Sequence, residues 1–319
     1  MSDIGFGTWA WGNKIIWGYR PEKDNVLLEK AFNKAIQGGL TFIDTADSYG
    51  IGNLNGQSEK LLGDYIEKLP DTQKKKLTIA TKLAPFPWRQ GKNSVKQAFI
   101  SSKRRLKGNL NRVQIHWSTS RYAPWQEVQF LDCLADLFEN ESLTELGLSN
   151  FGPNRLKWMH ARLQKRGIPL KSLQIQFSLL ASPSINEQKI KDFCKEKDIE
   201  LIAYSPLALG ILAIPPERLY SPSTFIRNRI FQQVLPKTIP LRTTLNNIGK
   251  RYKASQVEVA LNWCRSHGTK PIPGIRNPSQ VQALLSALTW KLTQQEKDIL
   301  DQLRKKCPIY MPVNPFQSS

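Results

Sequence analysis

Short apolar runs rich in β-branched residues alternate along the chain with longer amphipathic stretches. Short apolar runs are typical of buried strands, whereas apolar positions that recur at the helical period indicate helices. Strands that alternate with helices of this length predict parallel βαβ units. The predicted strands are Ile4–Trp9, Thr41–Ala46, Leu77–Lys82, Val113–Trp117, Leu143–Asn150, Ser172–Ser178, Ile199–Ser205 and Lys270–Ile275.

The amphipathic stretches between these strands predict eight helices. Gly38 and Gly39 end the first one, and Pro153 begins the fifth, where its missing N–H costs little. Eight such units in 319 residues favour a closed (β/α)8 TIM barrel over an open doubly wound sheet, so the prediction is an α/β protein with one domain over residues 1–319. The predicted helices are Asp24–Gln37, Ser58–Leu69, Asn93–Lys107, Trp125–Glu139, Pro153–Arg166, Glu187–Lys197, Ser255–Ser266 and Ser279–Leu288.

The segment 206–240 interrupts this alternation. Loops of this length inside a compact domain are usually functional. We therefore predict a long loop that acts as a lid over a ligand site. Its prolines are Pro206, Pro215, Pro216, Pro222, Pro236 and Pro240.

Composition places the chain among globular proteins that build a sizeable core, since 40% of residues are hydrophobic and 23% are charged. No apolar run approaches the roughly 18 residues of a membrane-spanning helix, and the amino terminus does not resemble a signal peptide. The four cysteines are far apart, without a Cys-x-x-Cys pair, and there are only three histidines. These features predict a cytoplasmic protein without disulfides and without a metal site.

The charge is unusual, because 46 Lys and Arg against 26 Asp and Glu give a net charge of +20. Three interpretations stay open: solvated helix faces, peripheral association with an anionic membrane, and nucleic-acid binding. No nucleic-acid-binding motif supports the third, so we expect no specific nucleic-acid partner. Part of the positive field also attracts an anionic cofactor. The sequence carries no signal for the oligomeric state.

Polar residues lie at the ends of three consecutive predicted strands. Asp44 ends the second strand and Tyr49 follows it, Lys82 ends the third, and His116 lies near the end of the fourth. Barrel enzymes carry their chemistry at the carboxyl ends of the strands. We therefore expect these four side chains to converge on one rim. Each alone has a structural explanation, as a loop cap, a packing residue, a surface lysine or a core histidine, but their joint occurrence favours catalysis.

The chemistry of this set is coherent. A phenol is a weak acid at neutral pH, and a nearby cation such as Lys82 lowers its pKa. Asp44 would hold Lys82 charged through an ion pair. His116 would hydrogen-bond a substrate carbonyl and direct it toward Tyr49, which would donate the proton.

The segment Phe42-Ile43-Asp44-Thr45-Ala46-Asp47-Ser48-Tyr49-Gly50 resembles the signature of the aldo-keto reductases. Lys82 and His116 fall where the catalytic tetrad of that family needs them. The resemblance covers nearly the whole chain. It includes Gly5–Trp9, Gln57–Gly63, Gly147–Phe151, Gln174–Ser178, Ala203–Leu207 and Ile272–Pro278.

The resemblance implies a (β/α)8 barrel that reduces small carbonyl substrates with NADPH, giving NADP+, and that carries the catalytic tetrad Asp44, Tyr49, Lys82 and His116. It implies that the 206–240 segment covers the cofactor. Arg276 would pair with the 2′-phosphate, since a guanidinium matches phosphate geometry, and this favours NADPH over NADH. The cofactor-binding residues that it implies are Gly7, Thr8, Trp9, Ser149, Asn150, Gln174, Tyr204, Ser205, Leu207, Gly210, Gly274, Arg276 and Gln280.

The resemblance gives four of these residues specific roles. Ser149, Asn150 and Gln174 would bind the nicotinamide carboxamide, and Tyr204 would stack on its ring. One departure concerns the adenosine end, where Ala283 and Leu284 replace the usual polar pair, which alters the expected adenine contacts.

Tryptophans follow several predicted strand ends. Trp9, Trp88 and Trp117, together with Trp11 and Trp17, would line a pocket for apolar or aromatic carbonyls, with core packing as the alternative. The segments around Trp11 and Trp88 are similar to a cyanobacterial and chloroplast subgroup, and the lack of a transit peptide favours a cyanobacterial protein. Some members of the family are cofactor-bound regulatory subunits of membrane proteins, so a binding subunit with little turnover is the second hypothesis.

Overall fold

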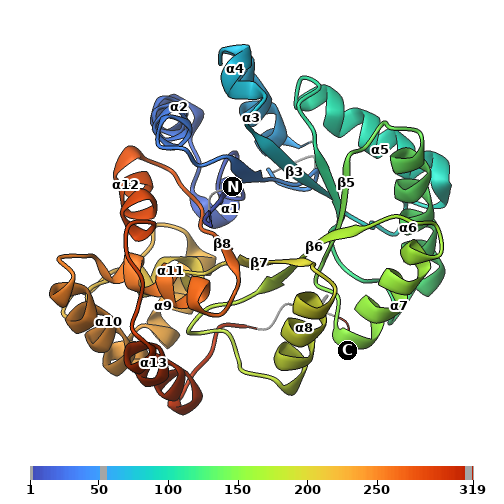
Figure 1. Ribbon diagram of the computed structural model, residues 1–319. Helices are drawn as coiled ribbons and strands as arrows, with labels where there is room; N and C mark the ends of the chain where they lie inside the picture. The colour runs from blue at the N-terminus through green and yellow to red at the C-terminus, as the bar shows by residue number, and fades with distance from the viewer. Residues whose placement is uncertain (1–2, 51–55, 313–317, 319) are drawn as a thin grey trace. The chain divides into compact units, whose positions relative to one another are not determined.

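The computed structural model describes residues 3–50, 56–312 and 318. Within these residues, eight strands alternate with helices, and their order in the sheet follows the chain from β1 to β8 (Figure 1). This topology is that of a (β/α)8 barrel, which confirms the predicted fold class. The strands are β1 (Phe6–Gly7), β2 (Phe42–Asp44), β3 (Thr78–Leu83), β4 (Arg112–Ile115), β5 (Glu145–Ser149), β6 (Leu170–Gln176), β7 (Glu200–Tyr204) and β8 (Lys270–Ile272).

Each predicted helix is present, with ends close to those expected. The first one ends at Gln37, and Gly39 follows in the left-handed region with a φ of 84°. Pro153 is the first residue of its helix, as predicted. The helices that match the predictions are α2 (Pro21–Gln37), α3 (Gln57–Glu67), α5 (Gly91–Arg105), α6 (Pro124–Glu139), α7 (Pro153–Gln164), α8 (Ile185–Glu196), α11 (Gln256–Ser266) and α12 (Pro278–Ala287).

Further helices lie where the sequence predicted none. The segment 206–240 is not an uninterrupted loop, because it contains η1, α9 and η2. Two of its prolines lie at helix starts: Pro236 begins η2, and Pro240 is the second residue of α10. The additional helices are α1 (Lys14–Trp17), α4 (Asp71–Lys74), η1 (Ala208–Ala213), α9 (Phe225–Val234), η2 (Pro236–Thr238), α10 (Ile239–Arg251) and α13 (Gln294–Lys306).

The described residues form two compact units, and each is described by itself. The first unit contains 3–40, 176–183 and 203–312. The second contains 41–50, 56–175, 184–202 and 318.

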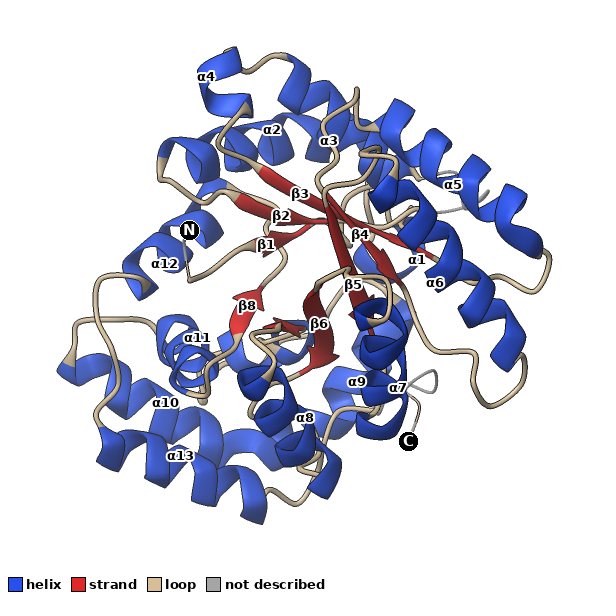
Figure 2. Cartoon of the chain, turned by 45° about the vertical axis from the view of Figure 1, so that its right-hand side comes forward, coloured by secondary structure: helices blue, strands red, loops and turns tan. Residues whose placement is uncertain are grey.

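In the second unit, strands β2 to β6 pair in parallel, and helices α5 and α6 pack beside them (Figure 2). Asp44 pairs with Ala80, and Lys82 pairs with Gln114 on the next strand. Parallel pairing brings the carboxyl ends of these strands to one edge. The side chains at the strand ends are therefore neighbours, although the chain separates them widely.

The opposite edge of the same strands is held by a buried arginine. Arg112 begins β4 and is fully buried. Its Nε donates to Glu145 Oε2 at 2.7 Å, and its Nη1 donates to Glu200 Oε2 at 2.6 Å. Its guanidinium also lies 5.1 Å from the centre of the Phe42 ring. A buried guanidinium is tolerated only with such partners, so this contact joins three strands of the unit at their amino-terminal edge.

The core of the first unit contains a stack of aromatic rings. Phe177 and Trp263 are nearly parallel, with ring centres 4.9 Å apart. The guanidinium of Arg304, from α13, lies 5.1 Å from the Phe177 ring and donates from Nη2 to the Ala181 carbonyl at 3.0 Å. Cation–π and hydrogen-bond contacts thus attach α13 to this core.

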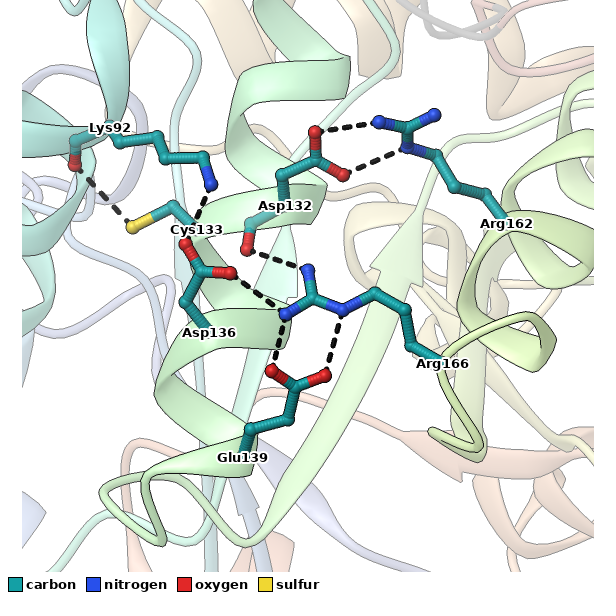
Figure 3. A network of polar contacts seen from close by, with 7 residues as sticks. All are labelled: Lys92, Asp132, Cys133, Asp136, Glu139, Arg162 and Arg166. Carbon is teal, nitrogen blue, oxygen red and sulfur yellow. Dashed lines mark hydrogen bonds and ion pairs between the residues drawn. The ribbon is translucent and has the colours of Figure 1, made fainter.

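An ion-pair network connects α5, α6 and the end of α7 in the second unit (Figure 3). Arg162 donates two hydrogen bonds to Asp132, at 2.8 and 2.7 Å. Arg166 contacts both Asp136 and Glu139, and this raises the pKa of the Arg166 guanidinium. The remaining members are Lys92, which pairs with Asp136 at 2.7 Å, and Cys133, whose pKa burial raises to about 11.

The described part of the chain offers neither a helix able to span a membrane nor a group of metal ligands. None of its helices combines the length and hydropathy that crossing a bilayer requires. No three of its His, Cys, Asp and Glu side chains gather as metal ligands.

Candidate active site

The four predicted catalytic residues lie together in the second unit. Asp44 is the last residue of β2, and Lys82 is the second-last residue of β3. His116 directly follows β4, and its N–H donates to the Leu83 carbonyl at 3.1 Å. Tyr49 lies in the turn after β2. The expected convergence is therefore seen, while the catalytic roles of these residues stay predictions.

Asp44 is the centre of a buried polar group. Its Oδ2 lies 2.5 Å from Lys82 Nζ, and both side chains are 1–2% exposed. Its Oδ1 accepts hydrogen bonds from Gln114 Nε2 at 3.1 Å and from Gln174 Nε2 at 2.9 Å. Lys82 Nζ also donates to the Thr45 carbonyl at 2.8 Å. The predicted Asp44–Lys82 ion pair is thus confirmed.

Lys82 also contacts the face of the predicted proton donor. Its Nζ lies 4.8 Å from the centre of the Tyr49 ring. The Tyr49 and His116 rings meet edge to face, with centres 5.7 Å apart. Ser48 Oγ lies 3.1 Å from His116 Nδ1. The ammonium, the phenol and the imidazole therefore form one contiguous group.

The pKa of Tyr49 differs from the sequence prediction. We expected Lys82 to lower it, but desolvation raises the pKa of Tyr49 well above its usual range, and the negative charge of Asp44 adds to this shift. The charge of Lys82 is largely balanced by Asp44 in the ion pair. Tyr49 is therefore a neutral phenol that retains its proton.

The two basic groups shift in the other direction. Burial lowers the pKa of Lys82, and Asp44 opposes that shift. Burial lowers the pKa of His116 well below its usual range, and the charge of Lys82 lowers it further. His116 is therefore neutral at neutral pH. If Ser48 donates to Nδ1, the imidazole proton lies on Nε2 and is available to an acceptor.

Ser149, Asn150 and Gln174 lie beside this group in the second unit. Asn150 follows β5 in the left-handed region with a φ of 62°, and its N–H donates to the Gln174 carbonyl at 2.9 Å. Its Nδ2 donates to the His116 carbonyl at 3.0 Å and to Ser149 Oγ at 3.1 Å. These three residues are thus held to the same edge as the tetrad.

The remaining predicted cofactor residues belong to the first unit. Gly7, Thr8 and Trp9 follow one another at the end of β1, and Gly7 bridges to Gly274 after β8. Tyr204 ends β7, and its carbonyl accepts from the Phe177 N–H at 3.3 Å. Several residues around Leu207, in the predicted cofactor-binding segment, have left-handed backbone. They are Ser205, Ala208, Leu209 and Gly210, with φ values of 51°, 49°, 57° and 99°. The N–H groups of Ala208 and Gly210 donate within this turn, to the Ser205 and Leu207 carbonyls at 2.9 Å each.

Arg276 is half-buried and already has a partner. Its Nη2 lies 3.3 Å from Asp24 Oδ1. Its backbone N–H donates to Gln280 Oε1 at 2.7 Å. Leu284 is buried in α12 and Ala283 is half-buried, so no polar side chain is offered at these two positions.

Arg227 is a basic residue that the sequence reasoning missed. It lies in α9, is only 9% exposed, and donates from Nη2 to the Leu209 carbonyl at 3.1 Å. Its guanidinium lies 4.4 Å from the centre of the Trp17 ring. Its Nε has no hydrogen-bond partner among the described residues, and the charge of Arg276 contributes to lowering its pKa, after burial. Tyr220 opposes this lowering of the pKa, and no ion pair joins Arg227 to a carboxylate in the described part of the chain. A buried cation in these surroundings suits an anionic ligand.

The five tryptophans of the predicted pocket lie in different surroundings. Trp11 is fully buried and donates to the Ile275 carbonyl at 2.7 Å, so the core-packing alternative holds for it. Trp9 and Trp17 meet edge to face at 5.7 Å in the first unit. Trp88 is 70% exposed, and Trp117 is half-buried beside His116. Trp88 and Trp117 therefore suit a binding role better than a core role.

A model of the aldo/keto reductase family matches residues 3–305. Among curated proteins, the chloroplastic pyridoxal reductase of Arabidopsis thaliana is 43% identical over 324 residues, which cover 100% of this chain and 87% of that protein. The NADH-specific methylglyoxal reductase of Escherichia coli is 25% identical, with 95% and 94% covered.

Solved structures share the fold. A glycerol dehydrogenase from Gluconobacter oxydans superposes with a TM-score of 0.78 at 22% identity, covering 100% of this chain and 96% of that one. An aldo-keto reductase from Klebsiella pneumoniae in complex with NADPH has a TM-score of 0.72 at 22% identity, with 99% and 95% covered. At this identity the likeness concerns the fold alone.

Proposed function

The chain belongs to the aldo/keto reductase family, and on that premise we propose that it is an oxidoreductase that uses NADPH to reduce an aldehyde or a ketone to an alcohol. The observation that carries this proposal is the buried Asp44–Lys82 pair against the face of Tyr49, with His116 at the edge of the phenol. Such a group can donate a proton to a carbonyl oxygen and stabilise the charge that results.

Tyr49 and His116 would bind the carbonyl oxygen together. Tyr49 would donate from its hydroxyl, and neutral His116 would donate from Nε2. NADPH, when bound, supplies the hydride that the carbonyl carbon accepts, leaving NADP+. As the carbonyl oxygen gains negative charge, it becomes a stronger base than a phenolate and takes the proton of Tyr49. The raised pKa of Tyr49 is consistent with this order, because the phenol keeps its proton until the alkoxide develops.

Lys82 would act after the proton has moved. The transfer leaves a phenolate, and the ammonium 4.8 Å from the ring centre stabilises it by charge. Asp44 keeps that ammonium protonated despite its burial. Solvent then returns a proton to Tyr49, and the alcohol leaves.

The side chains present suit a dinucleotide with phosphates. Arg227 is buried with an unpartnered Nε and lies within electrostatic range of Arg276. We assign Arg276 to the 2′-phosphate, which carries more charge than Asp24 and can replace it, and Arg227 to the pyrophosphate. In the second unit, Ser149, Asn150 and Gln174 would bind the carboxamide, as the family resemblance implies.

Pyridoxal is the substrate that we propose to test first. The relative with 43% identity is a pyridoxal reductase. Supporting this choice, Trp88 and Trp117 offer aromatic surface near His116, and a pyridine ring can stack on such surface. The carbonyl to be reduced is the aldehyde on that ring.

Purified protein should oxidise NADPH when pyridoxal is added. Tyr49→Phe should abolish this turnover while NADPH still binds, since the phenol supplies only the proton. Tyr252→Phe is the matched control, because the Tyr252 hydroxyl contacts Glu296 in the first unit and takes no part in the proposed chemistry. Equal turnover by Tyr49→Phe and wild type would refute the role of Tyr49.

A broad panel of aldehydes and ketones extends the test. If NADPH binds tightly but no carbonyl in the panel is reduced, the chain is a cofactor-binding subunit, which is the second hypothesis from the sequence. A cytoplasmic location and peripheral attachment to an anionic membrane rest on sequence and charge alone and stay predictions.

A further inference from the structure

The loop between β3 and α5, residues 84–90, is held by three side chains, one of which, Arg89, belongs to the loop itself. Asp47, which is 3% exposed, accepts a hydrogen bond from the Ala84 N–H at 3.1 Å and one from Arg89 Nη1 at 2.5 Å. Arg89 Nη1 also donates to the Ala84 carbonyl at 2.7 Å. The carboxylate and the guanidinium thus close the loop at both of its ends.

A third residue holds the same loop from α6. Gln126 is fully buried, and its Nε2 donates to the Phe86 carbonyl at 2.7 Å and to the Arg89 carbonyl at 3.0 Å. Residues 84–90 belong to no helix or strand. Their conformation therefore depends on these contacts rather than on regular backbone pairing.

The loop presents two stacked rings. Phe86 and Trp88 are nearly parallel, with centres 4.7 Å apart and planes 7° apart. The Arg89 guanidinium lies 5.3 Å from the centre of the Phe86 ring. Trp117, from the loop after β4, meets Phe86 edge to face at 5.9 Å. We refer to Phe86, Trp88 and Trp117 as the aromatic shelf.

The aromatic shelf continues into the reaction centre. The Trp117 and His116 rings are 5.0 Å apart, and the His116 and Tyr49 rings are 5.7 Å apart. Trp88 forms the far end and is 70% exposed. An indole this exposed adds little to the core. Its orientation is nevertheless fixed, because it stacks on Phe86 and because Asp47, Arg89 and Gln126 hold the loop that carries it. A fixed, exposed ring is suited to stacking on a flat ligand.

We propose that Asp47 and Arg89 are positioning residues that hold the aromatic shelf in place, and that the shelf makes the enzyme select planar aromatic aldehydes over small aliphatic ones. This inference rests on the proposed function of the same site. A flat aldehyde stacks on the shelf while its carbonyl reaches Tyr49 and His116. A small aliphatic aldehyde contacts the reaction centre alone, so it gains nothing from the shelf.

The test compares two probes, pyridine-4-carbaldehyde and propanal, in wild type, Trp88→Ala, Arg89→Ala and Arg89→Lys. Trp88→Ala and Arg89→Ala should raise KM for pyridine-4-carbaldehyde by roughly tenfold, the upper range for one aromatic pair. For propanal, KM and kcat should change less than about twofold. Arg89→Lys should recover part of the loss, because an ammonium can still bridge Asp47 and Ala84. Arg121→Ala, in an exposed position of the neighbouring loop, is the control and should match wild type.

A measurement without turnover separates this proposal from the proposed function. Ligand-detected NMR should show 4-pyridinemethanol, the product alcohol, binding to wild type and to Arg121→Ala but weakly to Trp88→Ala and Arg89→Ala. If wild type reduces neither aldehyde but this binding pattern holds, the shelf is a binding surface and the reductase assignment fails. Suppose that wild type reduces both aldehydes. The shelf proposal is then overturned if Trp88→Ala and Arg89→Ala lose activity toward both aldehydes equally. It is also overturned if they keep full activity toward both and bind the alcohol as wild type does.

Discussion

Replacement of Asp44 by Asn tests the ion pair on which the proposed chemistry depends. In the native protein, Oδ2 faces the ammonium of Lys82, and Oδ1 accepts from the amides of Gln114 and Gln174. Asparagine has one oxygen for these two directions. If that oxygen faces the glutamines, its NH2 faces a cation; if it faces Lys82, the NH2 faces two amide donors. Either orientation sets donor against donor.

The loss of stability that we expect for Asp44→Asn lies at the upper end of the usual range for a broken buried ion pair. Removing one partner of a buried ion pair costs about 3–5 kcal/mol. Because Asp44 and Lys82 are only 1–2% exposed and Asn cannot satisfy both sets of donors, we expect the free energy of unfolding to fall by about 4–5 kcal/mol. Turnover of correctly folded protein should fall roughly 10²–10³-fold, since Lys82 loses the carboxylate that orients it and favours its charged form.

The deficit, meaning the difference in the free energy of unfolding between wild type and Asp44→Asn, should depend on pH. Burial lowers the pKa of Lys82 and Asp44 opposes this, so the Asn variant has a still lower folded-state pKa. Between that value and the unfolded value of about 10.4, the unfolded chain binds more protons than the folded one. The free energy of unfolding of the variant therefore rises with pH in this window. Between the folded-state pKa of Lys82 in the variant and its higher folded-state pKa in the wild type, only the variant gains stability as pH rises, so the deficit shrinks from neutral to alkaline pH.

Urea unfolding followed by circular dichroism at neutral and alkaline pH measures this deficit. Asp71→Asn is the matched control, because its side chain is 85% exposed and its surface pair with Lys74 contributes less than about 1 kcal/mol. The double variant Asp44→Asn/Lys82→Met should be more stable than Asp44→Asn alone, because it buries no unpaired cation. A deficit below about 1 kcal/mol that is the same at both pH values would refute the reasoning.

Three further predictions concern protons and cofactor binding. Because the pKa of Tyr49 is raised and that of His116 is lowered, kcat for reduction should stay level across the neutral range, and a limb near about 6.5 in the pH profile would contradict a neutral His116. Arg276→Ala should raise the Kd for NADPH at least about tenfold, and that for NADH less than about twofold, in fluorescence titrations, because a charge-assisted contact to the 2′-phosphate is lost. Arg227→Met should weaken the binding of both NADPH and NADH, since both carry the pyrophosphate. Equal affinities of wild type and variant would refute the assignment of Arg227 to the pyrophosphate.

The strands were predictable because each is a short, mostly buried segment with apolar residues, and most helices because longer amphipathic stretches separate these segments. Parallel pairing then places the ends of β2, β3 and β4 on one edge, so the positions of Asp44, Lys82 and His116 along the chain were enough to predict that they meet. The Asp44–Lys82 ion pair follows from the same reasoning, because opposite charges at neighbouring buried strand ends must pair.

The helices between η1 and α10 were missed because prolines were interpreted as loop residues. Pro236 and Pro240 lie in the first turns of helices, where the missing N–H has no partner to lose. The last helix, α13, carried a signal that was overlooked. Thr293 and Glu296 form a capping box there, and a Thr followed three residues later by Glu is a known start pattern.

Within the site, several properties depend on contacts between segments that are distant along the chain, so the sequence alone could not predict them. The pKa of Tyr49 depends on its desolvation and on where Asp44 lies, neither of which a strand pattern specifies. Arg227 lies in a helix that was not expected, so its approach to Leu209 could not be foreseen. The contact of Asp47 with Arg89 joins positions 42 residues apart, and although Asp47 lies in the signature segment, nothing in the sequence pairs it with Arg89.

The network of Figure 3 has a practical consequence for handling the molecule. Three cations, Lys92, Arg162 and Arg166, are matched there by three carboxylates of α6, so this patch is locally neutral in a chain of net charge +20. The excess charge therefore lies elsewhere, and a negatively charged resin or chip should capture the protein through other surfaces. A fluorophore or tether attached at the exposed Glu141, just beyond α6, should then stay turned toward the solution.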